Sequence, residues 1–323
     1  MENAIFFGNG FNLVSENRYS WSELLKEMGD KTEILSSLPP TMQYEYIFLN
    51  SKRDYKDTPK KTRETRFKEA IVKRIKEFKH NEFYDRLIGL NVRDYLTTNY
   101  DDAFFKDTLD VVAYIGNEKI YSIRRRSELQ KNGERHSKYL FHLHGHIKRI
   151  ASIMIGFDQY IGASRRVDQW VKGEYARTRT VKGTKVTYDK VPSIAKRLND
   201  VSMNGDYGIE PTKTGLYSWI DAFFFRNLHI IGFALEFCES DIWWLLVKRA
   251  RLIKKDGNLI RNKIFYYVTD PFHLIDKHKL DYLRTLDVEI VLHDHLGGID
   301  GTEVDYKAIY SSQISNLEHN LTI

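Results

Sequence analysis

The stretch AIFFGNGFN at residues 4–12 decides the fold that the rest of the chain follows. Its first four residues are apolar, as in a parallel strand that is buried on both faces. The run ends at Gly8, and Gly10 follows after one intervening residue. Glycine permits a tight turn and lets backbone N–H groups come close to a phosphate. Because Leu13 stands where a G-x-G-x-x-G pattern would have its third glycine, the stretch predicts a strand-to-helix turn with only part of that pattern.

Five further apolar runs have the length and composition of strands. They cover residues 92–97, 139–143, 228–231, 264–268 and 288–292. Segments with helical character separate them, which is typical of a parallel sheet covered by helices on both faces. We therefore expect one α/β domain over residues 1–323. Helical insertions are expected at about residues 29–88 and 156–222, and the second of these is rich in lysine and arginine.

Bulk composition limits the classes of protein to which the chain can belong. The 323 residues carry a formal charge of +6, a mild excess that favours anionic ligands and leaves contact with nucleic acid open. Cys238 is the single cysteine, so the sequence can form neither an internal disulfide nor a cysteine-rich zinc ribbon. No apolar run is long enough to span a bilayer, and the first residues lack the pattern of a signal peptide. These features predict a cytoplasmic protein without a membrane segment.

Polar or glycine-containing segments follow several of the predicted strands. In an open parallel sheet, ligands bind beyond the carboxyl ends of the strands. The second run leads into TTNYDD at residues 97–102, whose hydroxyl, amide and carboxylate groups also suit helix caps. The third run leads into FHLHGH at residues 141–146, and the fourth into GFAL at residues 232–235. Gly232 would allow the backbone to approach a ligand closely.

The first two histidines of the segment FHLHGH allow two interpretations. Alternation along a strand puts His142 and His144 on one face. One of them can act as a general base, because the pKa of histidine lies near neutrality. Alternatively, the His-x-His pair binds a metal, with His293 and His295 as further candidate ligands.

These four segments, in this order, resemble the sirtuin-like superfamily. The glycine turn at residues 8–12 is similar to the first loop of bacterial sirtuin-like and abortive-infection proteins. Residues 97–101 resemble the Thr-Gln-Asn-Ile-Asp segment of sirtuins, and the pair at 144–145 resembles the His-Gly that carries their catalytic histidine. Residues 231–235 are similar to the Gly-Thr-Ser-Leu strand end of the superfamily. The resemblance implies a Rossmann-like, mostly parallel sheet.

Further stretches extend the resemblance, and two departures decide which function it implies. Residues 21–25 and 156–160 also resemble the bacterial subfamily, so that the likeness spans about residues 4–245. Sirtuin deacylases carry two Cys-x-x-Cys pairs on a zinc module, which one cysteine cannot supply. The first loop also lacks the Pro-Asp-Phe-Arg stretch of deacylases. The resemblance therefore implies an NAD hydrolase (NADase) of bacterial anti-phage defence, which releases nicotinamide and leaves ADP-ribose.

The resemblance also implies roles for particular residues. Asn99 would position water or the ribose hydroxyls, and His144 would be the neutral general base. Asp101 would bond a ribose hydroxyl or the nicotinamide amide, and backbone N–H groups of residues 8–10 would hold the diphosphate. The cofactor-binding set implied in this way is Gly8, Asn9, Gly10, Phe11, Asn12, Thr98, Asp101, Gly145, Gly232, Phe233 and Leu235. NAD would be the substrate, and no metal is expected.

Other functions and partners stay open on the sequence. The same pocket could bind NAD or an ADP-ribose derivative as a sensor, or the histidine cluster could serve a metal-dependent hydrolase. Transfer of ADP-ribose to a protein or nucleic acid is a further alternative. Since a constantly active NADase would poison its own cell, we expect control through homo-oligomerisation or a partner, such as a HerA-like ATPase or a phage-derived activator. Gly297 and Gly298 are the candidates for the adenine pocket.

Overall fold

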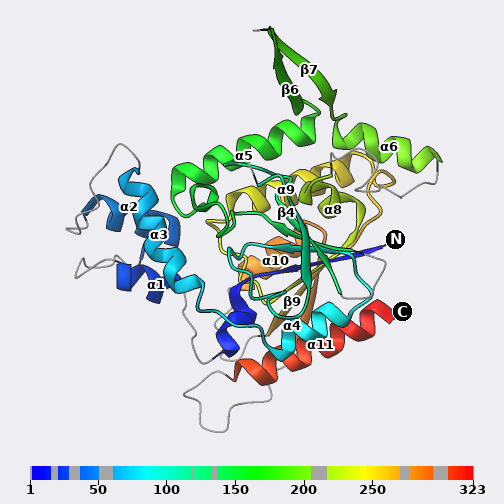
Figure 1. Cartoon of the computed structure of the whole chain (residues 1–323). Helices are drawn as coiled ribbons and strands as arrows, with labels where there is room; N and C mark the ends of the chain where they lie inside the picture. Colours follow the sequence, from blue (N-terminus) through cyan, green and yellow to red (C-terminus); the bar gives the residue numbers. More distant parts are fainter. Residues whose placement is uncertain are drawn as a thin grey trace.

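An eight-stranded sheet forms the centre of the molecule, and helices pack against it (Figure 1). The computed structural model describes residues 2–15, 21–28, 37–50, 61–117, 120–131, 137–182, 184–204, 217–269, 277–293 and 305–322. The strands of this sheet are β1 (Asn3–Phe7), β2 (Asp94–Thr97), β3 (Asp110–Ile115), β4 (Arg126–Gln130), β5 (Lys138–His142), β8 (Asn227–Ile231), β9 (Ile264–Thr269) and β10 (Val288–His293).

The order of the strands across the sheet is β10-β9-β8-β1-β2-β5-β4-β3. Neighbours from β10 to β5 run parallel, whereas β4 and β3 pair antiparallel at one edge. The six parallel strands are the six that the apolar runs predict, and numbered among themselves they follow the Rossmann order 3-2-1-4-5-6. The α/β class with a Rossmann-like, mostly parallel sheet is thus confirmed. The strand order reverses between β1 and β8, where such sheets bind ligands.

Each face of the sheet has its own hydrophobic core. Side chains alternate along β1, so that Ile5 and Phe7 face one side and Ala4 and Phe6 the other. On the Phe7 side lie α1 (Trp21–Met28), α2 (Pro40–Asn50), α3 (Arg63–Ile75), α4 (Glu82–Gly89) and α11 (Tyr306–Thr322). On the Phe6 side lie α5 (Phe157–Lys172), α6 (Ile194–Asn204), α8 (Trp219–Phe225), α9 (Ser240–Lys255) and α10 (Lys277–Thr285).

The burial of β1 on both sides explains why its sequence is apolar throughout. Phe6 and Phe7 are almost completely buried. Burying a side chain of this size contributes roughly 1.5–3 kcal/mol each. β1 is therefore the central element on which both helical layers depend. No helix in the described part of the chain is long and apolar enough to cross a membrane.

A separate two-stranded sheet interrupts the second predicted insertion. β6 (Ala176–Val181) and β7 (Thr184–Lys190) pair antiparallel between α5 and α6, and they project from the body of the molecule (Figure 1). The sequence analysis expected a helical insertion at residues 156–222, but this segment also contains the two strands of the hairpin. The threonines and valines of these strands explain the difference, because β-branched side chains favour strands.

A buried ion pair ties together the amino-terminal ends of β2 and β8. Arg226 Nε lies 3.2 Å from Asp94 Oδ2, and the Tyr217 hydroxyl donates to the same oxygen at 2.7 Å. Both charged side chains are at most 2% exposed. Removing one partner of a buried pair leaves an uncompensated charge, which is strongly destabilising. The pair lies at the edge of the sheet opposite the carboxyl ends of the strands.

We expect Arg226→Met to lower the free energy of unfolding by ~3–5 kcal/mol, because it removes the buried cation that bonds Asp94 and leaves the part-exposed Arg93 at 3.8 Å. Urea denaturation followed by circular dichroism measures this change. Lys172→Met is the matched control, since Lys172 pairs with Asp168 on the exposed side of α5. That change should leave the free energy of unfolding close to that of the parent, because the pair is exposed to solvent. Equal losses in the two variants would contradict a structural role for the buried pair.

Candidate functional site

The carboxyl ends of four strands lie in one row across the sheet. The pairing of Cα atoms aligns Phe7 of β1 with Ile231 of β8 and with Thr97 of β2. Thr97 is aligned in turn with His142 of β5. The chain therefore leaves all four strands at the same level. The glycine turn and the other three segments singled out from the sequence meet beside the crossover between β1 and β8.

A cavity of about 770 Å³ lies beyond this row of strand ends. Segments far apart in the sequence form its walls, including the turn after β1, the start of α9 and one side of α11. Eight of the residues predicted for the site line it: Asn9, Gly10, Thr98, Asn99, Asp101, His144, Gly232 and Phe233. Both predicted catalytic residues thus face the same space.

The remaining predicted residues support the walls from behind. Phe11 and Leu235 are fully buried in the two hydrophobic cores, on opposite faces of the sheet. Gly145 has a φ of 116°, and a Cβ there would lie 2.3 Å from the carbonyl oxygen of Ser152. Only glycine is therefore accommodated after His144. These three residues, together with Gly8 and Asn12, are the predicted residues that do not line the cavity.

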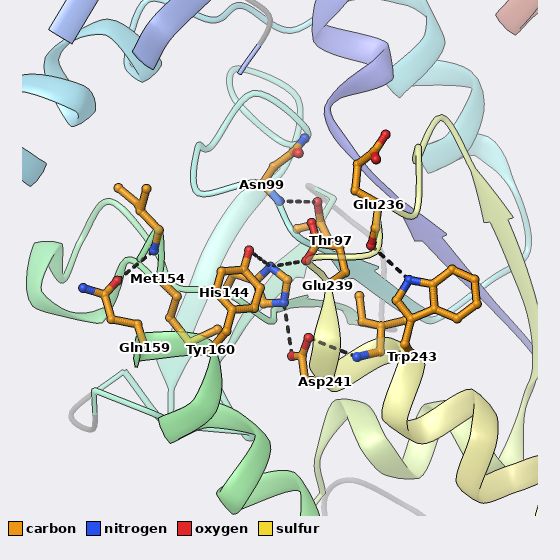
Figure 2. Close-up of polar contacts among 12 residues, drawn as sticks. Thr97, Asn99, His144, Met154, Gln159, Tyr160, Glu236, Glu239, Asp241 and Trp243 are labelled. Carbon is orange, nitrogen blue, oxygen red and sulfur yellow. Dashed lines mark hydrogen bonds and ion pairs between the residues drawn. The ribbon is translucent and has the colours of Figure 1, made fainter. Parts of the chain in front are cut away.

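His144 sits between two carboxylates and a tyrosine (Figure 2). Its Nε2 lies 3.2 Å from Asp241 Oδ2. On the other side of the ring, Nδ1 lies 3.2 Å from the Tyr160 hydroxyl and 3.3 Å from Glu239 Oε2. His144 and Asp241 are almost completely buried, whereas 14% of the Glu239 side chain is exposed. Tyr160 and Glu239 also line the cavity.

This arrangement fixes which ring nitrogen of His144 can act as a base. A carboxylate only accepts hydrogen bonds, so the nitrogen facing Asp241 must carry the proton. In the neutral ring, Nδ1 is then the lone-pair nitrogen, and the Tyr160 hydroxyl donates to it. Asp241 itself is held in place, because its Oδ1 accepts from the backbone N–H of Ile242 at the start of α9. The lone pair on Nδ1 of His144 therefore points to the side of the ring where Glu239 and Tyr160 lie.

The pKa values of His144 and Glu239 are linked through their contact. Burial lowers the pKa of His144, but the negative charges of Asp241 and Glu239 outweigh this and raise it above the ordinary value. Burial raises the pKa of Glu239 to about 7, while His144 lowers it and Asp241 raises it. Groups that interact this closely titrate as a pair. Near neutral pH the titrations of His144 and Glu239 are therefore coupled, and the raised pKa of His144 favours the protonated ring relative to the neutral ring that the sequence analysis expected.

Asn99 and Asp101 brace the turn that follows β1. The Asn99 side-chain amide donates to the carbonyl oxygen of Gly8 at 3.2 Å. Asp101 Oδ1 accepts from the backbone N–H of Ala103, and its Oδ2 accepts from Asn12 at 3.2 Å. Both oxygens of Asp101 therefore have internal partners, although the residue lines the cavity. Burial raises its pKa to about 6.

The glycine turn closes against the turn after β8. The N–H of Gly10 donates to the carbonyl oxygen of Gly232 at 2.9 Å. A Cβ on Gly10 would lie 2.7 Å from that oxygen and 2.2 Å from the Tyr310 hydroxyl, so no side chain fits there. The Gly10 N–H is thus already engaged. Of the three backbone amides predicted to hold a diphosphate, this one would bind only by giving up its internal bond.

The positions of the histidines differ from those that a His-x-His metal site would need. β5 ends at His142, so strand alternation does not extend to His144, and the two rings do not share a face as expected. The His142 ring contacts the tilted ring of His146 at 4.1 Å between centroids, and His142 lies outside the cavity lining. Burial lowers its pKa well below the ordinary value. The side chains of His293 and His295 lie outside the described residues, as do Gly297 and Gly298.

A second set of candidate ligands surrounds His144. One ligand atom each from His144, Glu239 and Asp241 lies within 4.8 Å of the others. The two carboxylates, however, approach opposite nitrogens of the ring. One ion can bind only one of these nitrogens. The arrangement therefore suits the holding and transfer of a proton better than the binding of a metal.

Glu239, Asp241 and Tyr160 are the site residues that sequence reasoning missed. Glu239 and Asp241 follow β8 at the point where α9 begins, and Tyr160 belongs to the stretch at residues 156–160 that entered the resemblance. The available signal was the presence of two carboxylates just beyond a strand end. No protein-family model matches the chain, and no curated protein matches it.

We expect Asp241→Asn to lower the pKa of His144, because the asparagine removes a negative charge next to Nε2. An NMR titration of the histidine ring protons measures this pKa. Asp168→Asn on the surface of α5 is the matched control and should leave the titration of His144 unchanged. An unaltered His144 pKa in Asp241→Asn would mean that this carboxylate does not set the charge of the ring.

Proposed function

We propose that the chain is an NAD glycohydrolase that splits NAD into nicotinamide and ADP-ribose. The observation that carries the proposal is the His144–Asp241 pair in the wall of a cavity at the β1/β8 crossover. A histidine oriented by a buried carboxylate is a general base ready to take a proton. Sheets with this strand order bind dinucleotides at the same crossover.

The shape of the cavity fits an extended ligand. Its lining runs from His144, just after β5, to Thr269 at the end of β9. β5, β2, β1, β8 and β9 are consecutive neighbours in the sheet. Four steps between strands at ~4.8 Å each give a length of roughly 19 Å. A volume of about 770 Å³ also lies within the range of cofactor sites. A dinucleotide would lie across the strand ends with its reactive half beside His144.

In the proposed reaction, the bond between the nicotinamide nitrogen and ribose C1′ breaks, and its electron pair leaves with nicotinamide. The oxygen of a water molecule then bonds to C1′, and the proton of this water passes to Nδ1 of His144. Asn99 would orient the water or the ribose hydroxyls from the neighbouring strand end. Asp241 would stabilise the protonated ring through Nε2.

The charges along the cavity complement those of NAD. Glu239 would place a carboxylate near the positive charge of the nicotinamide ring and of the ribose as the bond breaks. Lys279 lines another part of the cavity, where it donates to the carbonyl oxygen of Ala234 at 2.6 Å. A lysine in this wall would attract the diphosphate. The site thus offers opposite charges to opposite parts of the same ligand.

The biological setting of the proposal rests on the resemblance to bacterial sirtuin-like NADases. It supports a cytoplasmic enzyme that depletes NAD during phage infection. Control through homo-oligomerisation, a HerA-like ATPase or a phage-derived activator belongs to the same proposal. The bracing of Asp101 by internal bonds favours a structural role for this carboxylate over direct contact with the ribose.

We expect His144→Ala to reduce nicotinamide release by ~10²–10⁴-fold, because it removes the general base. Asn99→Ala should lose ~10²-fold or more, as an orienting hydrogen bond is lost. Chromatographic detection of nicotinamide at several protein concentrations measures both effects. Both variants releasing nicotinamide at the parent rate would show that the reaction occurs elsewhere.

The matched control is His319→Ala, which removes an exposed histidine on α11. It should retain the parent rate. The parent and this control should also retain activity in the presence of a chelator. Loss of activity to the chelator would favour the metal-dependent alternative, and NAD binding without nicotinamide release at any protein concentration would favour the sensor.

A pH profile tests the role of Glu239. Below about pH 7 the Glu239–His144 pair holds its shared proton, so kcat/KM should rise as the pH increases through that region. Glu239→Gln removes one of the two carboxylates that raise the pKa of His144. The acid limb of the profile should therefore move to lower pH, and kcat should fall because the positive charge loses its counter-charge. An unmoved limb in Glu239→Gln would contradict this coupling.

A further inference from the structure

The positive charge of the chain is concentrated in one segment, which the proposed hydrolase reaction does not use. Residues 165–197 carry ten lysines and arginines against three aspartates and glutamates, a net charge of +7. The whole chain has a net charge of +6, so the rest of the sequence is close to neutral. The segment comprises the second half of α5, the β6–β7 hairpin and the start of α6, and we call it the basic arm.

The hairpin in the middle of the basic arm stands apart from the rest of the fold. It projects away from the central sheet (Figure 1). In the part of the chain that the structure describes, β6 and β7 form a sheet of their own and pair with no other strand. Strands of six and seven residues, at ~3.3 Å a residue, give a ribbon roughly 20 Å long. The hairpin is therefore a narrow two-stranded ribbon that a partner can approach along its length.

Positively charged residues occur along the whole of this ribbon. Arg177 and Arg179 belong to β6, Lys182 to the turn, and Lys185 and Lys190 to β7. Residues 176–190 include a single acidic residue, an aspartate near the end of β7. Like charges at this density repel one another, and a polyanion along the ribbon would remove that repulsion. The charge is thus distributed for a long anionic partner and not for a single small anion.

The helices at the base of the ribbon continue the same charge. Arg165 and Arg166 of α5 and Lys196 of α6 are exposed. Other cations of the arm have carboxylate partners inside the protein, as in the ion pair of Arg197 with the buried Asp221 at 2.7 Å. That pair serves the attachment of α6 to the body of the molecule. The ribbon and the exposed cations at its base together form the surface that a polyanion would contact.

We propose that the basic arm binds the phosphate backbone of a DNA duplex, with the β6–β7 ribbon in the major groove. This groove is about 12 Å wide and admits a two-stranded β-ribbon. Arginine, lysine and threonine, which dominate both strands of the hairpin, are residues that bond phosphate oxygens. A duplex of RNA fits less well, because its major groove is deep and narrow. An anionic membrane also fits less well, since the turn at residues 181–184 has no aromatic residue to enter the bilayer surface.

Binding of a fluorescently labelled DNA duplex to the full chain, followed by anisotropy at several salt concentrations, tests the proposal. If the five cations of the ribbon contact phosphates, the logarithm of the binding constant should fall with the logarithm of salt concentration with a slope of about −4 to −5. A triple variant with Arg177→Thr, Arg179→Thr and Lys185→Thr keeps residues that favour strands. It should bind about tenfold or more weakly at low salt, and its slope should be shallower by about 3.

The matched control removes the same charge from another surface. Arg251→Gln, Lys254→Gln and Lys255→Gln together change three exposed cations of α9, and this variant should bind DNA within about twofold of the parent. Urea denaturation of both triple variants checks that they fold like the parent. Equal weakening in the two folded variants would show that only net charge matters and would overturn the proposal. So would no binding of the DNA duplex at low salt, or tighter binding of an RNA duplex or of vesicles with phosphatidylserine.

This inference does not depend on the proposed hydrolase, and two measurements keep the two apart. His144→Ala should bind the DNA duplex as the parent does. The triple variant of the ribbon should release nicotinamide from NAD at the parent rate when no DNA is present. NAD hydrolysis without DNA binding would overturn the role of the basic arm alone. DNA binding without NAD hydrolysis at any protein concentration would leave that role in place and count against the hydrolase.

Discussion

The hydrogen bond from the Gly10 N–H to the Gly232 carbonyl oxygen holds the centre of this structure. It joins the turns after β1 and β8, the two neighbouring strands whose connections leave in opposite directions. Both positions need glycine, because a Cβ on Gly10 would meet the carbonyl oxygen and Gly232 has a φ of 60°. Asn99 extends the brace to β2 through the Gly8 carbonyl oxygen. The turns that these bonds hold together form part of the cavity wall.

Burial decides how much of the fold can be predicted from the sequence. The six parallel strands are mostly apolar, so each is recognisable as a run of hydrophobic residues. β3 and β4 lie at the sheet edge, where DVVAYI alternates between exposed and half-buried residues and RSELQ includes charged ones. In the described part of the chain, β6 and β7 pair only with each other. The lysines and arginines in the hairpin hid the strand pattern in the sequence. Strands with an exposed or charged face need no continuous hydrophobic run, so sequence reasoning missed β3, β4 and the hairpin, whereas the other edge strand, β10, kept enough apolar residues to be recognised.

The same distinction between local and distant structure applies to the site. Asn99, His144 and the glycines follow strand ends directly, so the topology of a parallel sheet is enough to bring them together. Asp241 meets His144 across 97 positions of sequence, and the contact depends on how α9 docks onto the sheet. Gln313 reaches the cavity only because the last helix, α11, packs beside β9. Neither position is encoded in a local pattern, and both required the packed structure.

The coupling between Glu239 and His144 has a thermodynamic consequence beyond catalysis. A proton held by this pair lies beside two carboxylates, where a positive charge is stabilised. A cationic ligand that contacts Glu239 would have to compete with that proton. Linkage makes the effect reciprocal, so that protons would leave the protein when such a ligand enters, and acidification would weaken its binding. The occupancy of the pocket by a cation would then depend on the pH of its surroundings.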